Sequence, residues 1–146
     1  MQSYREMKKL REKILDSFQC IRERGEDGVW ISLLPLEDVI TQAERVESDS
    51  RELPLGGRTF AIKDNIDLAG LPTTAACPAF TYRPERSATV VRRLIDAGAV
   101  PIGKTNLDQF ATGPELHSLA LCQTEFLSSD IICPGLSWSS SVRART

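Results

Sequence analysis

The feature that most constrains this chain is a pair of short apolar runs with one amphipathic segment between them. The runs are 58-RTFAIK-63 and 99-AVPIG-103, and each leads directly into a polar loop. Between them, Val90, Val91, Leu94 and Ile95 recur at the spacing of one helix face. Strand, loop, helix and strand in this order form a βαβ unit. The sequence therefore predicts an α/β fold with parallel strand pairing.

Further elements are predicted on both sides of this unit. Ser87 can cap the helix between the strands, and Gly98 suits the position where that helix ends. Upstream, 29-VWISLL-34 is typical of a short strand that Pro35 ends. Two amphipathic helices flank that strand. Their apolar faces are Met7, Leu10, Ile14, Leu15, Phe18 and Ile21 in the first, and Leu36, Val39, Ile40, Ala43 and Val46 in the second.

Composition narrows the class of protein further. The 146 residues suit one ordinary domain, and a net charge of −2 gives no sign of a nucleic-acid-binding surface. No segment has the pattern of a signal peptide or a membrane span, which predicts a cytoplasmic protein without a membrane partner. The four cysteines (Cys20, Cys77, Cys122 and Cys133) form no CxxC pair, so we expect unpaired thiols and no metal site.

The last part of the chain differs from the rest. Residues 114–146 show no sustained apolar period, and only 130-DIIC-133 is typical of a strand. A long segment without periodic structure is more often irregular than ordered. We therefore divide the chain into residues 1–113 and a divergent tail, 114–146, that is irregular or disordered.

Lys63 ends the first apolar run of the βαβ unit. Ligands and chemistry gather at the carboxyl ends of strands in such sheets. Partial burial there lowers the pKa of a lysine amine and lets it accept a proton, as in Ser–Lys enzymes. The alternative is a solvated lysine paired with Asp64 or Asp67. Both interpretations stay open on these residues alone.

The second strand end repeats the design of the first. In 103-GKTNLDQFATG-113 a strand ends, a lysine follows and a polar loop begins. Parallel pairing would bring Lys104 and its loop beside Lys63, Asp64 and Asn65. The loop side chains Thr105, Asn106 and Asp108 then either contact a substrate or cap backbone amides.

The segments 58-RTFAIKDNIDLAGLPTTAACPAF-80 and 88-ATVVRRLIDAGAVPIGKTNLDQFATG-113 closely resemble the amidase signature family, and within it the allophanate hydrolases. The resemblance implies an α/β fold with a mixed sheet flanked by helices. Residues 1–113 would be the N-terminal portion of the amidase domain, with an incomplete sheet. The implied activity is hydrolysis of an amide C–N bond in a small molecule, here allophanate to ammonia and carbon dioxide, without a metal or organic cofactor.

The resemblance also implies roles for particular residues. Lys63 falls on the base of the family's Ser–cisSer–Lys triad, and Thr105, Asn106 and Asp108 fall in the loop that lines the substrate region. An ungapped alignment with the family's Gly- and Ser-rich loop places Ser137 at the position of the cis-serine. The preceding residue, Leu136, occupies a position where the family has a glycine. No serine corresponds to the nucleophile. The alternative is therefore a truncated, catalytically inactive remnant or a non-catalytic binding module, able to self-associate through exposed sheet edges.

Overall fold

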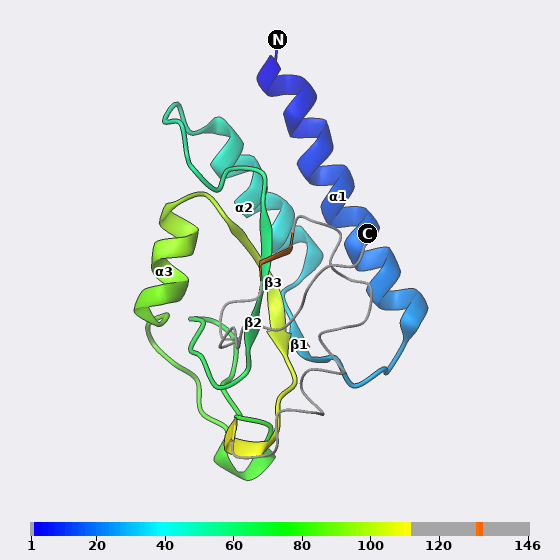
Figure 1. The fold of residues 1–146 in the computed structure, drawn as a ribbon, viewed down its shortest axis with the longest axis vertical. Helices are drawn as coiled ribbons and strands as arrows, with labels where there is room; N and C mark the ends of the chain where they lie inside the picture. The colour runs from blue at the N-terminus through cyan, green and yellow to red at the C-terminus, as the bar shows by residue number, and fades with distance from the viewer. Residues whose placement is uncertain (1, 112–130, 133–146) are drawn as a thin grey trace, which may run out of the picture.

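Four strands form one sheet in the order β1-β3-β2-β4 in the computed structural model, which describes residues 2–111 and 131–132 (Figure 1). The strands are β1 (Trp30–Leu33), β2 (Thr59–Lys63), β3 (Val100–Thr105) and β4 (Ile131–Ile132). The helices are α1 (Gln2–Arg24), α2 (Leu36–Ser48) and α3 (Thr89–Asp96), with the 3-10 turns η1 (Pro78–Phe80) and η2 (Gln109–Ala111).

Strand pairing confirms the predicted α/β class. β2 and β3 are parallel and α3 connects them, as the βαβ pattern predicted. β1 runs antiparallel to β3, and β4 runs parallel to β2 on its other side. The sheet is therefore mixed, and β4 falls within the segment predicted as a strand near residue 131.

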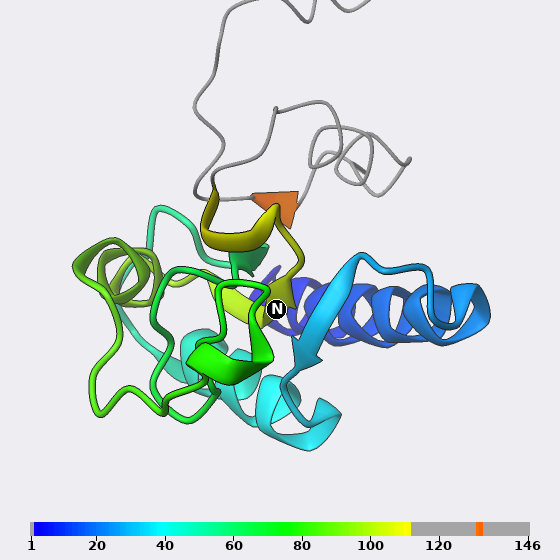
Figure 2. The ribbon, with the colours of Figure 1, turned by 90° about the horizontal axis from the view of Figure 1, so that it is seen from below.

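Helices cover both faces of the sheet. Figures 1 and 2 show α3 on one side and α1 with α2 on the other. The first core joins Leu10, Ile14, Phe18, Ile21, Val39 and Ala43 of α1 and α2 to Val100 and Ile102 of β3. The second joins Phe60, Ile62, Leu68, Val91 and Ala99 on the α3 side. Leu10, Ile14, Phe18 and Ile21 of α1 thus pack on their own domain, whereas Leu15, predicted on the same face, is 40% exposed. None of the described helices is long and apolar enough to cross a membrane.

Two predictions for α3 are wrong. Ser87 does not cap the helix, because its Oγ accepts a hydrogen bond from the backbone N–H of Ala69 at 2.9 Å. Val90 is not part of the packed face, since 46% of it is exposed while Val91 is buried. The predicted stop is confirmed: Gly98 follows the helix with φ of 98°, which favours glycine.

A register shift lies in the middle of the β2–β3 pair. Phe60 pairs with Pro101, but the next residue, Ala61, pairs with Gly103. One extra residue in a strand exchanges the faces on which all later side chains lie. Beyond the shift, Lys104 pairs with Ile62 and therefore shares the α3 face. Lys63 falls on the opposite face of the sheet.

Candidate active site

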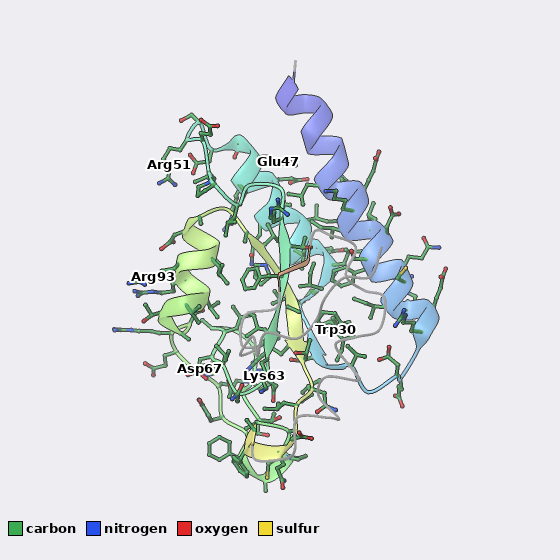
Figure 3. All side chains as sticks on the ribbon, in the orientation of Figure 1. Trp30, Glu47, Arg51, Lys63, Asp67 and Arg93 are labelled. Carbon is green, nitrogen blue, oxygen red and sulfur yellow. The ribbon has the colours of Figure 1, made fainter. Side chains whose placement is uncertain are left out.

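The carboxyl ends of β2 and β3 lie side by side, as the sequence predicted. Lys63 is the last residue of β2, is half-buried and pairs in register with Thr105 of β3. Figure 3 shows Lys63 at the lower end of β2, and Asp67 in the loop that follows. Within the part of the chain that the structure describes, the Lys63 ammonium forms no ion pair and no hydrogen bond. Its two expected acid partners are engaged elsewhere.

The acid that follows Lys63 pairs with the other lysine. The Lys104 and Asp64 side chains are both 0% exposed, with Lys104 Nζ 3.3 Å from Asp64 Oδ1. That oxygen accepts no hydrogen bond from any residue that the structure describes, so the contact is an ion pair only. Lys104 Nζ also donates to Thr73 Oγ1 at 2.8 Å and to the carbonyl of Pro72 at 3.1 Å.

Hydroxyl groups extend this ion pair in two directions. The other Asp64 oxygen, Oδ2, accepts hydrogen bonds from the Thr74 backbone N–H at 3.0 Å and from its hydroxyl. Asp67 Oδ1 accepts one from Thr73 at 2.8 Å and one from the Tyr82 hydroxyl at 2.7 Å. We call these six residues, Lys104, Asp64, Asp67, Thr73, Thr74 and Tyr82, the Lys104 network. It ties the end of β3 to the loop after β2.

Burial sets the electrostatics of the network. It lowers the pKa of the Lys104 ammonium, and the Asp64 carboxylate opposes that shift without cancelling it. A buried ion pair is stable only when its remaining donors and acceptors are satisfied, since desolvation costs several kcal/mol per ion. Thr73, Thr74 and the Pro72 carbonyl supply most of these hydrogen bonds.

The hydrogen bond from Tyr82 to Asp67 leads to a prediction that spectroscopy can test. The hydrogen bond to Asp67 raises the pKa of Tyr82, because the carboxylate stabilises the protonated phenol. Replacing Asp67 by asparagine removes that charge, so the Tyr82 pKa should fall toward its ordinary value. An ultraviolet titration of tyrosinate measures this, with a Tyr4→Phe background isolating the signal. An unchanged titration would contradict the hydrogen bond.

The loop that holds the two threonines has a strained backbone. Thr73 and Tyr82 form an antiparallel bridge through reciprocal backbone hydrogen bonds of 2.9 and 3.1 Å. Inside it, Ala75 and Ala76 have φ of 50° and 57°, in the left-handed region that favours glycine. The Ala75 carbonyl accepts a hydrogen bond from Phe110 N–H, which anchors the loop to η2. Such strain persists only where surrounding contacts enforce it.

The predicted substrate-region residues have different surroundings. Asn106 donates through Nδ2 to the carbonyl of Gly28 at 2.9 Å and accepts from Leu107 N–H at 2.9 Å, which fits the capping alternative. Thr105 Oγ1 lies 3.5 Å from the carbonyl of Ile62. The half-buried Asp108 side chain forms no hydrogen bond or ion pair among residues 2–111 and 131–132. Ser137 lies outside the described residues.

The sequence predicted the meeting of the two strand ends but not the burial of Lys104. Its predicted strand ended at Gly103, whereas β3 continues through Thr105 and places Lys104 inside the sheet. One signal was available: Thr73 and Thr74 are adjacent hydroxyl donors in a loop that also supplies Asp64 and Asp67.

Comparison with known proteins identifies the class. The model of the Amidase family matches residues 23–126, more than half of the chain. The chain therefore belongs to the amidase family, as the sequence resemblance implied.

Individual relatives narrow this class. The chain is 49% identical to urea amidolyase of Saccharomyces cerevisiae over 107 residues, which are 72% of this chain and 6% of that protein. Kluyveromyces lactis allophanate hydrolase matches 70% of this chain and 18% of its own at 52% identity, with a TM-score of 0.60. Peptide amidase from Stenotrophomonas maltophilia matches 73% of this chain and 22% of its own at 34% identity, with a TM-score of 0.60. The chain thus spans a small part of each of these proteins.

Proposed function

We propose that residues 1–113 form the N-terminal portion of an amidase domain that hydrolyses the C–N bond of a small amide. The observation that carries this proposal is the place of Lys63: half-buried, at the carboxyl end of a parallel strand and without an acid partner among the described residues. The carboxyl ends of parallel strands are where sheets of this kind bind their ligands, so a side chain at this place can reach a bound substrate.

The proposed reaction uses the lysine as the base of a Ser–cisSer–Lys triad. Lys63 would take a proton from the cis-serine, which takes one from the nucleophilic serine as that serine attacks the amide carbon. The 146-residue sequence offers no counterpart of this nucleophilic serine. Collapse of the intermediate breaks the C–N bond while the protonated Lys63 returns its proton, through the cis-serine, to the leaving nitrogen. The amine or ammonia departs and leaves an acyl-enzyme that water hydrolyses. Ser137 is the proposed cis-serine, and Thr105, Asn106 and Asp108 the proposed substrate region.

Allophanate is the proposed substrate, with ammonia and carbon dioxide as products. Its support is the 52% identity to Kluyveromyces lactis allophanate hydrolase, against 34% for the peptide amidase. A cytoplasmic location belongs to the same proposal, because Cys20 and Cys77 form no disulfide within the described part of the chain, as is usual in a reducing compartment.

The second candidate is a catalytically inactive remnant or binding module that associates through the edge of its sheet. One observation favours it: within the described part of the chain, Lys63 forms no hydrogen bond with any hydroxyl group, although a catalytic base needs one within reach. Among residues 2–111 and 131–132, β4 pairs with Thr59 and Phe60 of β2, and the later residues of β2 have no strand partner on that side.

Ammonia release from allophanate by the full chain tests the two candidates. We expect Lys63→Ala to lower turnover by about 10²–10⁴-fold, the usual contribution of a general base. Lys13→Ala, an exposed lysine on α1, is the matched control and should leave turnover unchanged. Turnover that survives Lys63→Ala refutes the proposed base.

A chain without turnover calls for a second experiment. Residues 23–111 would replace the corresponding segment of Kluyveromyces lactis allophanate hydrolase, with and without Lys63→Ala. Activity that depends on Lys63 in this chimera shows that the segment can supply the base, and favours the remnant interpretation for the isolated chain. An inactive but folded chimera contradicts the proposed function itself.

A further inference from the structure

We propose that three exposed aromatic side chains at the carboxyl end of the sheet form a docking surface for a second polypeptide that carries the remainder of an amidase domain, including its nucleophilic serine. The three are Phe80, Tyr82 and Phe110, which we call the aromatic cluster. This deepens the proposed function and rests on it, because the 146 residues supply Lys63 as the proposed base but no counterpart of that serine.

Exposed apolar surface is concentrated at the aromatic cluster. Among the described residues, the large exposed apolar side chains are Leu15, Phe80, Tyr82, Val90 and Phe110. Leu15 and Val90 belong to α1 and α3. The other three are in contact, because the Phe80 ring stands edge to face with Tyr82 at 5.6 Å between centroids and with Phe110 at 5.2 Å. Single exposed apolar residues are normal on a surface, whereas a contiguous patch points to an interaction.

The aromatic cluster lies beside the candidate active site. η1 follows β2 and η2 follows β3, and Figure 1 shows both turns together beyond the carboxyl ends of these strands. The Tyr82 hydroxyl donates to Asp67 of the Lys104 network at 2.7 Å, and the Tyr82 backbone is bridged to that of Thr73. A polypeptide bound on these rings would therefore stand next to the end of β2, where Lys63 lies.

Two strained turns hold the aromatic cluster in place. Phe110 and Ala111 of η2 have φ of 54° and 56°, in the left-handed region that favours glycine. Ala75 and Ala76, in the loop before η1, have φ of 50° and 57°. The Phe110 N–H donates to the Ala75 carbonyl at 3.0 Å, which joins one strained turn to the other. Strain of this kind is concentrated at functional sites, where the surrounding structure enforces it.

The remainder of an amidase domain fits the surfaces that this chain leaves open. Helices cover both faces of the sheet, so its edges and its carboxyl end remain for a large partner (Figure 1). Among residues 2–111 and 131–132, β2 has no strand partner past Phe60 on the β4 side, so residues 61–63 can accept a strand. The chain matches 18% of Kluyveromyces lactis allophanate hydrolase, so most of such an enzyme packs against this segment from outside. The aromatic cluster is the apolar part of the open surface.

Co-purification tests the docking surface. The full chain is co-expressed with tagged Kluyveromyces lactis allophanate hydrolase that lacks the segment matched by this chain, and the amount of chain retained with the tag is measured. We expect retention of the native chain, and about tenfold less of a variant with Phe80→Asp and Phe110→Asn, because loss of buried aromatic anchors weakens an interface strongly. Asparagine suits the left-handed backbone at position 110. Val90→Asp, at a similarly exposed residue of α3, is the matched control and should be retained like the native chain.

Each outcome of the co-purification decides the question. Equal retention of the native chain and the double variant overturns the proposal, and so does a soluble truncated enzyme that retains no chain. A truncated enzyme that stays insoluble beside the native chain also overturns it, since the docked chain should cover the apolar surface that truncation exposes. Circular dichroism verifies the fold of each variant. Should the double variant fail to fold, Phe110→Asn alone is compared with Val90→Asp: retention lower by about threefold or more supports the proposal, and equal retention refutes it.

Ammonia release from allophanate by the co-purified pair separates this proposal from the proposed function. Lys63→Ala should lower turnover and leave retention unchanged, because Lys63 lies outside the aromatic cluster. Retention without turnover keeps the docking surface and contradicts the proposed reaction. Turnover by the chain alone, together with no retention, keeps the reaction and refutes the docking surface.

Discussion

Replacing Lys104 by methionine is expected to lower the free energy of unfolding by about 3–5 kcal/mol, the usual cost of leaving a buried charge without its partner. The reason is that Asp64 would stay fully buried with one oxygen facing an apolar side chain. Urea unfolding followed by circular dichroism gives the change. Combining Lys104→Met with Asp64→Asn should recover most of the loss, because no charge then remains in the interior.

An exposed ion pair supplies the control for this measurement. Arg11 and Glu44 lie 3.9 Å apart with side chains that are 60% and 59% exposed. Such pairs contribute at most about 1 kcal/mol, so Arg11→Met should have a small effect. If Lys104→Met and Arg11→Met lowered the free energy of unfolding equally, burial of the Lys104–Asp64 pair would add nothing to stability.

Replacing Gly103 by alanine is expected to detach β1 from the sheet. A Cβ at this position would lie 2.4 Å from the Ser32 carbonyl oxygen and 2.9 Å from the Leu33 Cα. Both contacts are with backbone, so neither side can yield without moving a strand. The cost should exceed the roughly 1–3 kcal/mol of ordinary overpacking.

Trp30 reports the position of β1 because it is half-buried in that strand. In a Trp138→Phe background, Gly103→Ala should shift its fluorescence to longer wavelength. Gly56→Ala is the control, since the added Cβ would lie 3.2 Å from the nearest atom, the carbonyl oxygen of Leu53. A native spectrum and stability for Gly103→Ala would contradict the close approach of β1 and β3.

The fold was predictable from sequence to the extent that apolar periodicity sets it. The two apolar runs and the helix between them gave the β2–α3–β3 unit and its parallel pairing, because these signals are local. The register shift was not predictable, since it is a property of the pairing between β2 and β3, whose residues lie far apart in the chain. Ser87 failed as a cap for the same reason: its hydrogen bond goes to Ala69 in another loop.

The candidate site shows the same division between local and distant causes. The position of Lys63 at a strand end followed from the apolar run before it. The environment of Lys104 did not, because three of its contacts come from residues more than thirty positions earlier. A lysine at the predicted end of a strand is ordinarily solvated, and only the tertiary structure brings it against Asp64 and Thr73.

The order of strands in the sheet has a consequence for synthesis of the chain. β3 pairs with both β1 and β2, yet it follows both of them in the chain and is synthesised last of the three. At about 5–20 residues per second, the helices and strands made first wait several seconds for the strand that joins them. During that interval α1 and α2 have no sheet to cover. The nascent chain is therefore expected to bind holdase chaperones until β3 leaves the exit tunnel.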